Sequence, residues 1–411
     1  MRISTNTIYD TSTNAMLRQQ SDMLHTQQQV ASGKRMLTAA DDPLAAAQAL
    51  QVGEADAANA QYAVNRKQAQ HALGMSESVL QSVTALLQDA KVLAVNGGNA
   101  TLGSSDRAVL ATELRGKLEQ LLGLANSTDG AGQYLFAGYR STTVPFSVSG
   151  NAVAYAGDAG QRSMQVAASR TLEVSVSGTA VFERIKDGNG VFAVAANAAN
   201  NGTGISGQGV VTNAAALTGH DYAITFTVSG GATTYDVVDQ NLTPPTTGTA
   251  ILAAQPFVNV AGGGGTLSFD GLQFDISGNP ANGDVFAVSP SRNQSVFQTF
   301  NDLISTLEKP AGNASERTAL SNGLNRALQN LDHALDNVLG VRAGLGTRLR
   351  ELDTLDLTGQ DLSLQYRTTL SELQDVDYAA AISNLTRQQL YLEAAQKSFV
   401  KVSGLSLFNF V

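Results

Sequence analysis

The sequence predicts an α+β multidomain protein in which both chain ends form an elongated antiparallel helical bundle or coiled coil, with an inserted, mainly β domain. The chain has 411 residues, a length typical of two or three domains. Residues 141–290 hold 21 of its 39 glycines and six of its eight prolines, but 14 of its 61 charged residues. The flanking stretches are rich in Ala, Leu and Gln and have apolar residues at helical spacing.

A seven-residue apolar repeat predicts that the chain begins with a coiled-coil helix. Its members form two adjacent rows, Tyr9, Met16, Met23 and Val30 in one, and Leu17 and Leu24 in the other. A sustained repeat of this kind gives a narrow apolar seam that packs against another helix. Ser32-Gly33 predicts the end of the helix, because glycine readily adopts the left-handed conformation that closes helices.

Asp42-Pro43 predicts the start of a second helix, with Asp42 as its N-cap and Pro43 at the first helical position. No further proline interrupts the pattern before Gly97-Gly98, so we expect one long helix up to that point. Another helix is expected over residues 106–126.

Short runs of β-branched and aromatic residues predict the strands of a β sandwich or barrel. These runs are residues 144–148, 171–176, 222–228, 234–238, 267–274 and 285–288. Glycine-rich turns separate several of them, at residues 187–190, 229–231 and 262–265.

Helical periodicity returns after residue 290. We expect helices over residues 294–308 and 315–357, with Gly340, Gly344 and Gly346 as weak points, and a last helix over residues 363–402. In this last helix an apolar residue recurs every seven positions, at Tyr378, Leu385, Leu392 and Phe399. The chain then ends on an apolar segment that contains Phe408, which indicates an interface.

These elements suggest three domains. Residues 1–42 and 362–411 are expected to form the terminal coiled-coil helices, and residues 43–145 and 286–361 a helical-bundle domain. Residues 146–285 are expected to form a β-rich outer domain.

Composition excludes several classes of function. The sequence has no cysteine, which rules out disulfides, thiolate metal sites and a cysteine nucleophile. Its four histidines leave few general bases, and its net charge of −9 argues against a nucleic-acid partner. The glycine patterns at residues 202–207 and 187–190 lack the helix or carboxylates that a dinucleotide or calcium site needs. We therefore expect that the protein is not an enzyme, binds no cofactor and has no catalytic or metal-binding residue.

Several segments resemble one protein family. Residues 28–37 (QQVASGKRML), followed by Asp41-Asp42-Pro43, resemble the N-terminal signature of flagellin-like axial proteins, in the form found in their hook-associated branch. Residues 132–138 (GQYLFAG) resemble the segment that leads to the outer domain in that branch. Residues 340–353 (GVRAGLGTRLRELD), 375–379 (DVDYA) and 406–408 (SLF) complete the resemblance, which covers residues 1–146 and 285–411.

The resemblance implies a structural component of the bacterial flagellum that joins the hook to the filament. Its implied partners are copies of itself in a ring, the other hook-associated junction protein, flagellin, and an export chaperone that binds the C-terminal helix. The sequence lacks a secretory signal and a run of roughly 18 apolar residues, which alone predicts a cytoplasmic protein without membrane insertion. The resemblance replaces that location with the extracellular flagellum, reached through the flagellar type III apparatus without a cleaved signal peptide.

The expected sites are assembly interfaces. Axial contacts are expected from Tyr9, Met16, Leu17, Met23, Leu24 and Val30 against Tyr378, Leu385, Leu392, Phe399 and Phe408. Asp41, Asp42 and Pro43 are assigned to the joint between the terminal helices and the next helical layer.

Two alternatives stay open. The chain could be a flagellin that builds the filament in bulk, although the Asp-Asp-Pro form disfavours this. Less favoured is an adhesin or glycan-binding β domain displayed on a helical stalk. That function needs an exposed aromatic cluster, for which the candidates are Tyr222, Phe226, Tyr235, Phe269 and Phe274.

Overall fold

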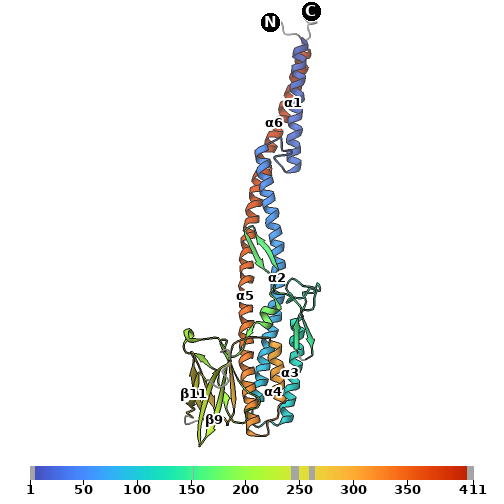
Figure 1. The fold of residues 1–411 in the computed structure, drawn as a ribbon. Coiled ribbons are helices and arrows are strands. Elements are labelled where there is room, and N and C mark those ends of the chain that lie inside the picture. The colour runs from blue at the N-terminus through green and yellow to red at the C-terminus, as the bar shows by residue number, and fades with distance from the viewer. Residues whose placement is uncertain (1–4, 151, 242–249, 259–263, 405–411) are drawn as a thin grey trace, which may run out of the picture. The chain divides into compact units, whose positions relative to one another are not determined.

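The computed structural model describes residues 5–150, 152–241, 250–258 and 264–404 (Figure 1). They divide into two compact units. The terminal unit takes in the chain up to Arg66, the short segment Val166–Arg170, and the chain from Asp353 onward. The central unit comprises Lys67–Gln165 and Thr171–Leu352.

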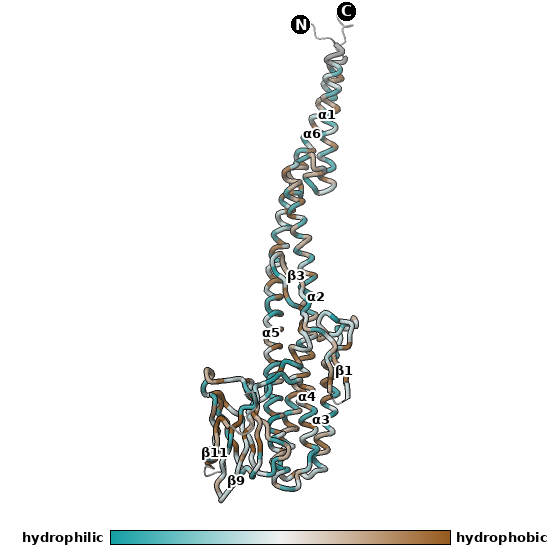
Figure 2. The backbone as a smooth tube through the Cα atoms, viewed as in Figure 1, coloured by the Kyte–Doolittle hydropathy of each residue, from teal (hydrophilic) through white to brown (hydrophobic). Residues whose placement is uncertain are grey.

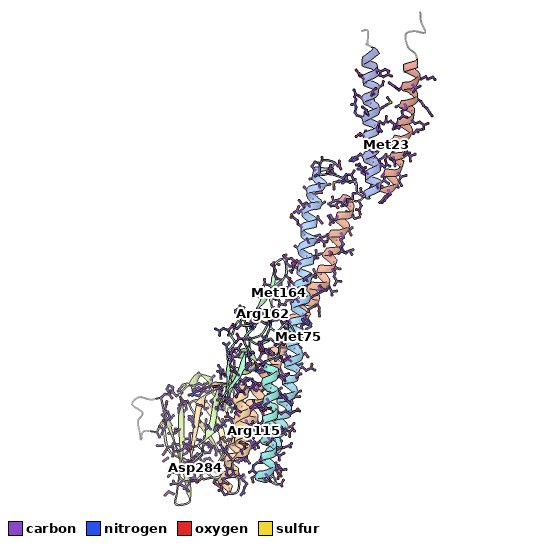
Figure 3. The ribbon with its side chains drawn as sticks, turned by 90° about the vertical axis from the view of Figure 1, so that its right-hand side faces the viewer. Met23, Met75, Arg115, Arg162, Met164 and Asp284 are labelled. Carbon is purple, nitrogen blue, oxygen red and sulfur yellow. The ribbon has the colours of Figure 1, made fainter. Side chains whose placement is uncertain are left out.

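The terminal unit is built almost entirely of helices. It contains α1 (Thr5–Ser32), α6 (Tyr378–Gly404), the first part of α2 (Pro43–Gly97) and the last part of α5 (Ala314–Gln374). Helices α1 and α6 lie side by side and antiparallel (Figures 1 and 3). The predicted end of the first helix at Ser32-Gly33 and the predicted start of the second at Asp42-Pro43 are both confirmed.

The central unit combines a helical bundle with a β sandwich. The remaining parts of α2 and α5 belong to it, together with α3 (Ser104–Ala125) and α4 (Val296–Glu308), which pack on each other. Before the sandwich the chain forms β1 (Phe146–Ser149), β2 (Ala152–Tyr155), β3 (Ser163–Ala167), β4 (Arg170–Glu173) and a π-helical turn at Thr179–Glu183. In Figure 2 apolar colouring recurs along α4 and along the strands.

Two antiparallel sheets form the sandwich. The first has the order β11-β10-β9-β14-β6 and consists of Leu252–Pro256, Ala232–Asp239, Tyr222–Ser229, Val285–Pro290 and Phe192–Ala196. The second has the order β12-β13-β7, with Gly264–Phe269, Leu272–Ser277 and Ile205–Ser206; β8 (Val210–Val211) also pairs with β13. A short 3-10 turn lies at Ala214–Ala216, and β5 (Ile185–Lys186) pairs with β15 (Asn293–Gln294). Both sheets contribute to one buried core that includes Ile224, Phe226, Leu267, Ile276 and Phe286.

The α+β prediction is confirmed, and three details of it are wrong. The helices expected to end at residue 357 and to start again at residue 363 are one helix, α5, which breaks at residues 375–377 instead. The expected domain boundary at 361/362 therefore falls inside a helix. Gly340, Gly344 and Gly346 do not interrupt it, because a helical glycine costs only about 1 kcal/mol and buried neighbours such as Leu345 hold the helix in place.

The third correction concerns the run predicted as one strand over residues 267–274. It forms the hairpin β12–β13, with Asp270-Gly271 at the turn. Both turn residues have positive φ, +44° and +76°, which matches the twist that a tight hairpin requires.

Candidate assembly interface

Helices α1 and α6 pair through one of the two apolar rows predicted for the first helix. On α1 the half-buried residues include Met16, Met23 and Val30, and Thr26 is buried; on α6 Ala381 is buried and Leu385, Leu392 and Phe399 are half-buried. The rings of Tyr9 and Phe399 meet edge to face, with their centroids 4.8 Å apart. Met23 is labelled on α1 in Figure 3, where α6 runs alongside. We call this contact the α1–α6 seam.

The other predicted row is exposed to solvent. Leu17 is 58% exposed and Leu24 is 48% exposed, and Tyr378 on α6 is also exposed. Leu17 and Leu24, one heptad apart, form what we call the outward row. Exposed leucines at coiled-coil spacing are suited to a further helix. Phe408, the last of the expected contact residues, lies outside the described residues.

Polar residues interrupt the seam. Gln19 on α1 and Gln388 on α6 are half-buried between apolar neighbours. The side-chain carbonyl oxygen of Gln388 is buried and accepts no hydrogen bond from the described residues. Such positions lower the stability of a helix pair while favouring one register.

The joint between α1 and α2 lies at the same level as the break between α5 and α6. Lys34 and Asp375 form an antiparallel β-bridge. The backbone N–H of Arg35 donates to the Gln374 carbonyl at 2.7 Å, and that of Val376 donates to the Gly33 carbonyl at 2.9 Å. This isolated β-bridge therefore connects the break between α1 and α2 to the break between α5 and α6.

Asp41 and Asp42 hold the joint in shape. One Asp41 carboxylate oxygen accepts the backbone N–H groups of Leu37 and Thr38, each at 2.8 Å, and the other lies 3.2 Å from His25 Nε2. These N–H groups, followed by His25, lower the pKa of Asp41. Asp42 accepts the Ala45 N–H at 3.0 Å as the N-cap of α2.

The N-cap follows directly from the sequence pattern, whereas other parts of the joint do not. Gly33 has φ +72°, and a side chain there would also meet the Tyr378 hydroxyl. The Arg35 guanidinium donates to the Leu373 carbonyl at the end of α5 and lies 3.3 Å from Asp42. The heptad register at Tyr378 gave no sign of this contact with Gly33, because the partners are more than 300 positions apart.

An apolar groove lies beside the joint. Its volume is about 570 Å³. It is lined mainly by Met36, Leu37, Ala46, Ala49, Leu50 and Leu370. The terminal unit therefore presents apolar surface at its joint as well as along α1.

The remaining segments of the family-like pattern stabilise the central unit. In residues 340–353, Arg342 donates to Glu77 of α2 at 2.7 and 3.0 Å, and Leu345 is buried. In residues 132–138, Phe136 packs edge to face on Phe182, with centroids 5.4 Å apart. These motifs therefore have structural explanations.

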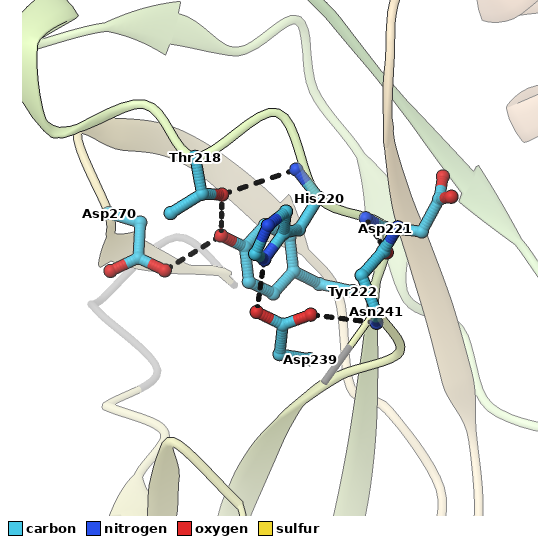
Figure 4. Close-up of polar contacts among 7 residues, drawn as sticks. All are labelled: Thr218, His220, Asp221, Tyr222, Asp239, Asn241 and Asp270. Carbon is cyan, nitrogen blue, oxygen red and sulfur yellow. Dashed lines mark hydrogen bonds and ion pairs between the residues drawn. The ribbon is translucent and has the colours of Figure 1, made fainter. Parts of the chain in front are cut away.

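No catalytic arrangement emerges among the described residues, and no three His, Asp or Glu side chains there are grouped to hold a metal ion. Figure 4 shows a polar cluster at one end of the sandwich. The Tyr222 hydroxyl donates to Asp270 at 2.7 Å and also bonds Thr218, while His220 Nδ1 lies 2.6 Å from Asp239. Burial raises the pKa of Tyr222 to about 12. The cluster joins the two sheets.

The aromatic residues considered for glycan binding are all in the sandwich core. Tyr222, Phe226, Tyr235, Phe269 and Phe274 are each buried. Across the part of the chain that the structure describes, no helix combines the length and the hydropathy needed to span a membrane.

Known proteins are similar to this chain in sequence and in fold. The family model of the bacterial flagellin N-terminal helical region matches residues 3–141. The flagellar hook-associated protein 3 of Escherichia coli (strain K12) is 30% identical over 410 residues, which cover 100% of this chain and 99% of that protein.

Solved structures agree with this relationship. The crystal structure of flagellar hook-associated protein 3 from Legionella pneumophila is 32% identical, with a TM-score of 0.73, over 79% of this chain and 98% of that one. A crystal structure of the flagellar junction protein FlgL from Legionella pneumophila is also 32% identical, with a TM-score of 0.70, over 80% of this chain and 100% of that one.

Proposed function

This chain belongs to the flagellar hook-associated protein 3 family, and on that premise we propose that it is a structural element of the flagellum that joins the hook to the filament. One observation from the structure supports the proposal most strongly. Among the described residues of the terminal unit, the buried hydrophobic residues are Ala45, Ala49, Val166 and Ala381. Three of these are alanines, so the unit has almost no core of its own.

A unit with so small a core gains little from folding alone. Ordering the backbone costs about 1–2 kcal/mol per residue, which apolar burial must offset. The alanines bury little area, while Leu17, Leu24 and Leu50 remain exposed. The missing burial is available if other molecules cover the outward row and the groove, so assembly would add stability to a unit that is only marginally stable alone.

The proposed partners follow from this requirement and from the family. Copies of the same chain in a ring would cover the outward row, and the axial contacts would come from Tyr9, Met16, Met23 and Val30 against Leu385, Leu392 and Phe399. The second hook-associated junction protein and flagellin would contact the two sides of the ring. Before export, a chaperone would shield α6.

The location and the kind of function belong to the same proposal. The chain would pass through the flagellar type III apparatus without a cleaved signal peptide and act in the extracellular flagellum. Its task would be mechanical and not enzymatic. The terminal helices would comprise residues 1–42 and 362–411, and the helical bundle residues 43–145 and 286–361. Asp41, Asp42 and Pro43 would form the joint between these two domains. Residues 146–285 would form the outer domain.

A deletion strain tests the proposal by electron microscopy. We expect hooks of normal appearance without filaments, and flagellin shed into the medium. Expression of the intact chain should restore the filaments. Filaments that stay attached in the deletion strain would contradict the junction function. Hooks that lack filaments while no flagellin is found in the medium would instead favour the filament-subunit alternative.

The adhesin alternative lacks its main requirement. The five aromatic residues that could stack on sugars are in the core, and no other observation favours glycan binding. A glycan array probed with the whole chain should therefore show no binding.

A further inference from the structure

Within the terminal unit, helices α2 and α5 lack the large interlocking side chains that pair the helices of an ordinary coiled coil. Large interlocking side chains normally fix the register of two paired helices. In this unit the buried hydrophobic residues of α2 among those described are Ala45 and Ala49, whose small side chains offer little resistance to sliding. The register of α2 against α5 must therefore come from other contacts.

Three polar contacts join the two helices there. Asn59 Nδ2 donates to the Gly359 carbonyl at 2.7 Å, and Ser363 Oγ donates to Asp56 at 2.9 Å. Arg66 Nε donates to Asp356 Oδ1 at 3.1 Å. All three are directional, so a slide of one residue along either helix would break each of them.

Arg66 has the most constrained position of the three. Its side chain is 2% exposed. A Cβ atom on Gly359 would overlap the Arg66 guanidinium, so glycine at position 359 leaves the space that the guanidinium fills. The arginine therefore inserts between the two helices at one level.

Arg66 also binds a third segment. Its Nη1 donates to the Val166 carbonyl at 3.1 Å, and the Val166 side chain is fully buried. Val166 lies on β3 beside the turn to β4, which places the tip of the β3–β4 hairpin on this helix pair. The guanidinium of Arg66, a residue of α2, thus binds both α5 and the β3–β4 hairpin.

This ion pair adds little to stability, because the Arg66 side chain is 2% exposed while the Asp356 side chain is 27% exposed. The cost of removing the guanidinium from water cancels most of its attraction to the carboxylate, and apolar replacements of such pairs are often as stable. The best-attested benefit of such a pair is a unique register. The planar fork of arginine suits this role because its donors point in fixed directions.

We propose that Arg66, Asp356 and Gly359 form a register lock that fixes α2, α5 and the β3–β4 hairpin tip in one alignment. This goes beyond the proposed junction function and does not depend on it, because the lock acts within a single chain. Without the Arg66–Asp356 contact, the bonds from Asn59 to Gly359 and from Ser363 to Asp56 would hold the register less firmly, and the helices would populate alignments that differ by one helical turn, about 5 Å along the axis.

Distance measurements between spin labels test the lock. The sequence has no cysteine, so two introduced cysteines carry the only labels. One pair, at Leu50 and Leu357, reports sliding of α2 along α5; a second pair, at Val64 and Ser169, reports the hairpin tip. All four positions are exposed. The protein with native Arg66 should give one narrow distance distribution for each pair.

The informative variant replaces the ion pair with apolar residues, Arg66→Met with Asp356→Leu. It should still fold, yet its Leu50–Leu357 distribution should broaden or gain a second maximum about 5 Å away. The matched control is Lys91→Met with Asp332→Leu, which removes an exposed ion pair between the same two helices. This control should keep the narrow distribution.

Two outcomes would overturn the lock. A narrow distribution at the parent distance in the apolar variant would show that other contacts set the register. Failure of that variant to fold would show that the cluster supplies stability instead. Arg66→Lys adds an independent check, because lysine keeps the charge without the fork. It should broaden the distribution measured from Ser169, and an unchanged distribution there would count against the proposal.

Discussion

At the scale of single residues, the joint depends on one carboxylate. Asp41 accepts the N–H groups of Leu37 and Thr38, which lie in the segment between α1 and α2. We predict that Asp41→Ala accelerates amide hydrogen exchange at Leu37 and Thr38, because their acceptor is gone. Asp361→Ala, which changes an exposed residue on α5, should leave these amides unchanged.

The same carboxylate makes the joint sensitive to acid. The pKa of Asp41 is below its ordinary value of 3.8, so ionised Asp41 favours the folded joint. Its contribution is complete above pH 3.8 and is lost as the pH falls through the lowered pKa. Exchange at Leu37 and Thr38, corrected for intrinsic rates, should therefore rise only under these acidic conditions, and should be insensitive to pH in Asp41→Ala.

Tyr222 provides a second prediction at this scale, for alkaline pH. Tyr222→Phe leaves Asp270 and Thr218 without their partner and should lower the free energy of unfolding by about 1–3 kcal/mol. Because its pKa is raised from 10 to about 12, the neutral phenol favours the folded state. Its contribution should persist below pH 10 and disappear between pH 10 and 12.

Urea denaturation at pH 8 and at steps up to pH 12 measures both effects. The difference in stability between the parent and Tyr222→Phe should shrink across that alkaline range. Tyr139→Phe is a suitable control because Tyr139 is 67% exposed. An equal loss of stability in this control would argue against the hydrogen bonds of Tyr222 as the cause.

Local chemistry explains which residues could be predicted from the sequence. The N-cap at Asp42 and the turn at Gly33 depend on neighbouring residues, and both are confirmed. Arg66 could not be found in this way. Its partner Asp356 is 290 positions away, and Gly359 lies in the stretch expected to separate the helices of residues 315–357 and 363–402. How two helices align cannot be predicted from the sequence pattern of either helix alone.

At the scale of elements, glycines in α5 serve opposite roles. An added Cβ on Gly344 meets nothing within 4 Å, whereas one on Gly323 would overlap Thr306 of α4. We predict that Gly344→Ala stabilises the isolated chain by about 0.5–1 kcal/mol through helix propensity. Gly323→Ala should destabilise it by about 1–3 kcal/mol, because α4 must move. Thermal unfolding of both variants measures this contrast, and equal shifts in one direction would refute it.

The sequence predicts the two apolar rows of α1, but it does not predict which row packs on α6. Heptad spacing identifies both rows, and the sequence assigns both to axial contacts. In the single chain the residues Met16, Met23 and Val30 are half-buried in the α1–α6 seam, and the outward row is exposed. A seven-residue period shows which residues share a stripe, while the partner of each stripe depends on where the second helix lies.

At the scale of the whole molecule, the two units differ in where their stability comes from. The central unit buries phenylalanines and leucines in its bundle and sandwich, including Phe226, Phe286, Phe297 and Leu331. The terminal unit buries little beyond alanine among its described residues. The units should therefore respond differently to changes on their surfaces, since the proposed assembly would cover apolar surface of the terminal unit.

This contrast gives the last prediction. Leu17→Ala with Leu24→Ala changes two exposed residues, so the unfolding temperature of the isolated chain should stay within the small range typical of surface substitutions. The same variant should fail to restore filaments in a deletion strain, because the outward row can no longer be covered. Leu385→Ala with Leu392→Ala should instead weaken the α1–α6 seam in the isolated chain, seen as faster amide exchange in both helices. If Leu17→Ala with Leu24→Ala restored filaments fully, the outward row would have no part in assembly, and the groove beside the joint would become the stronger candidate interface.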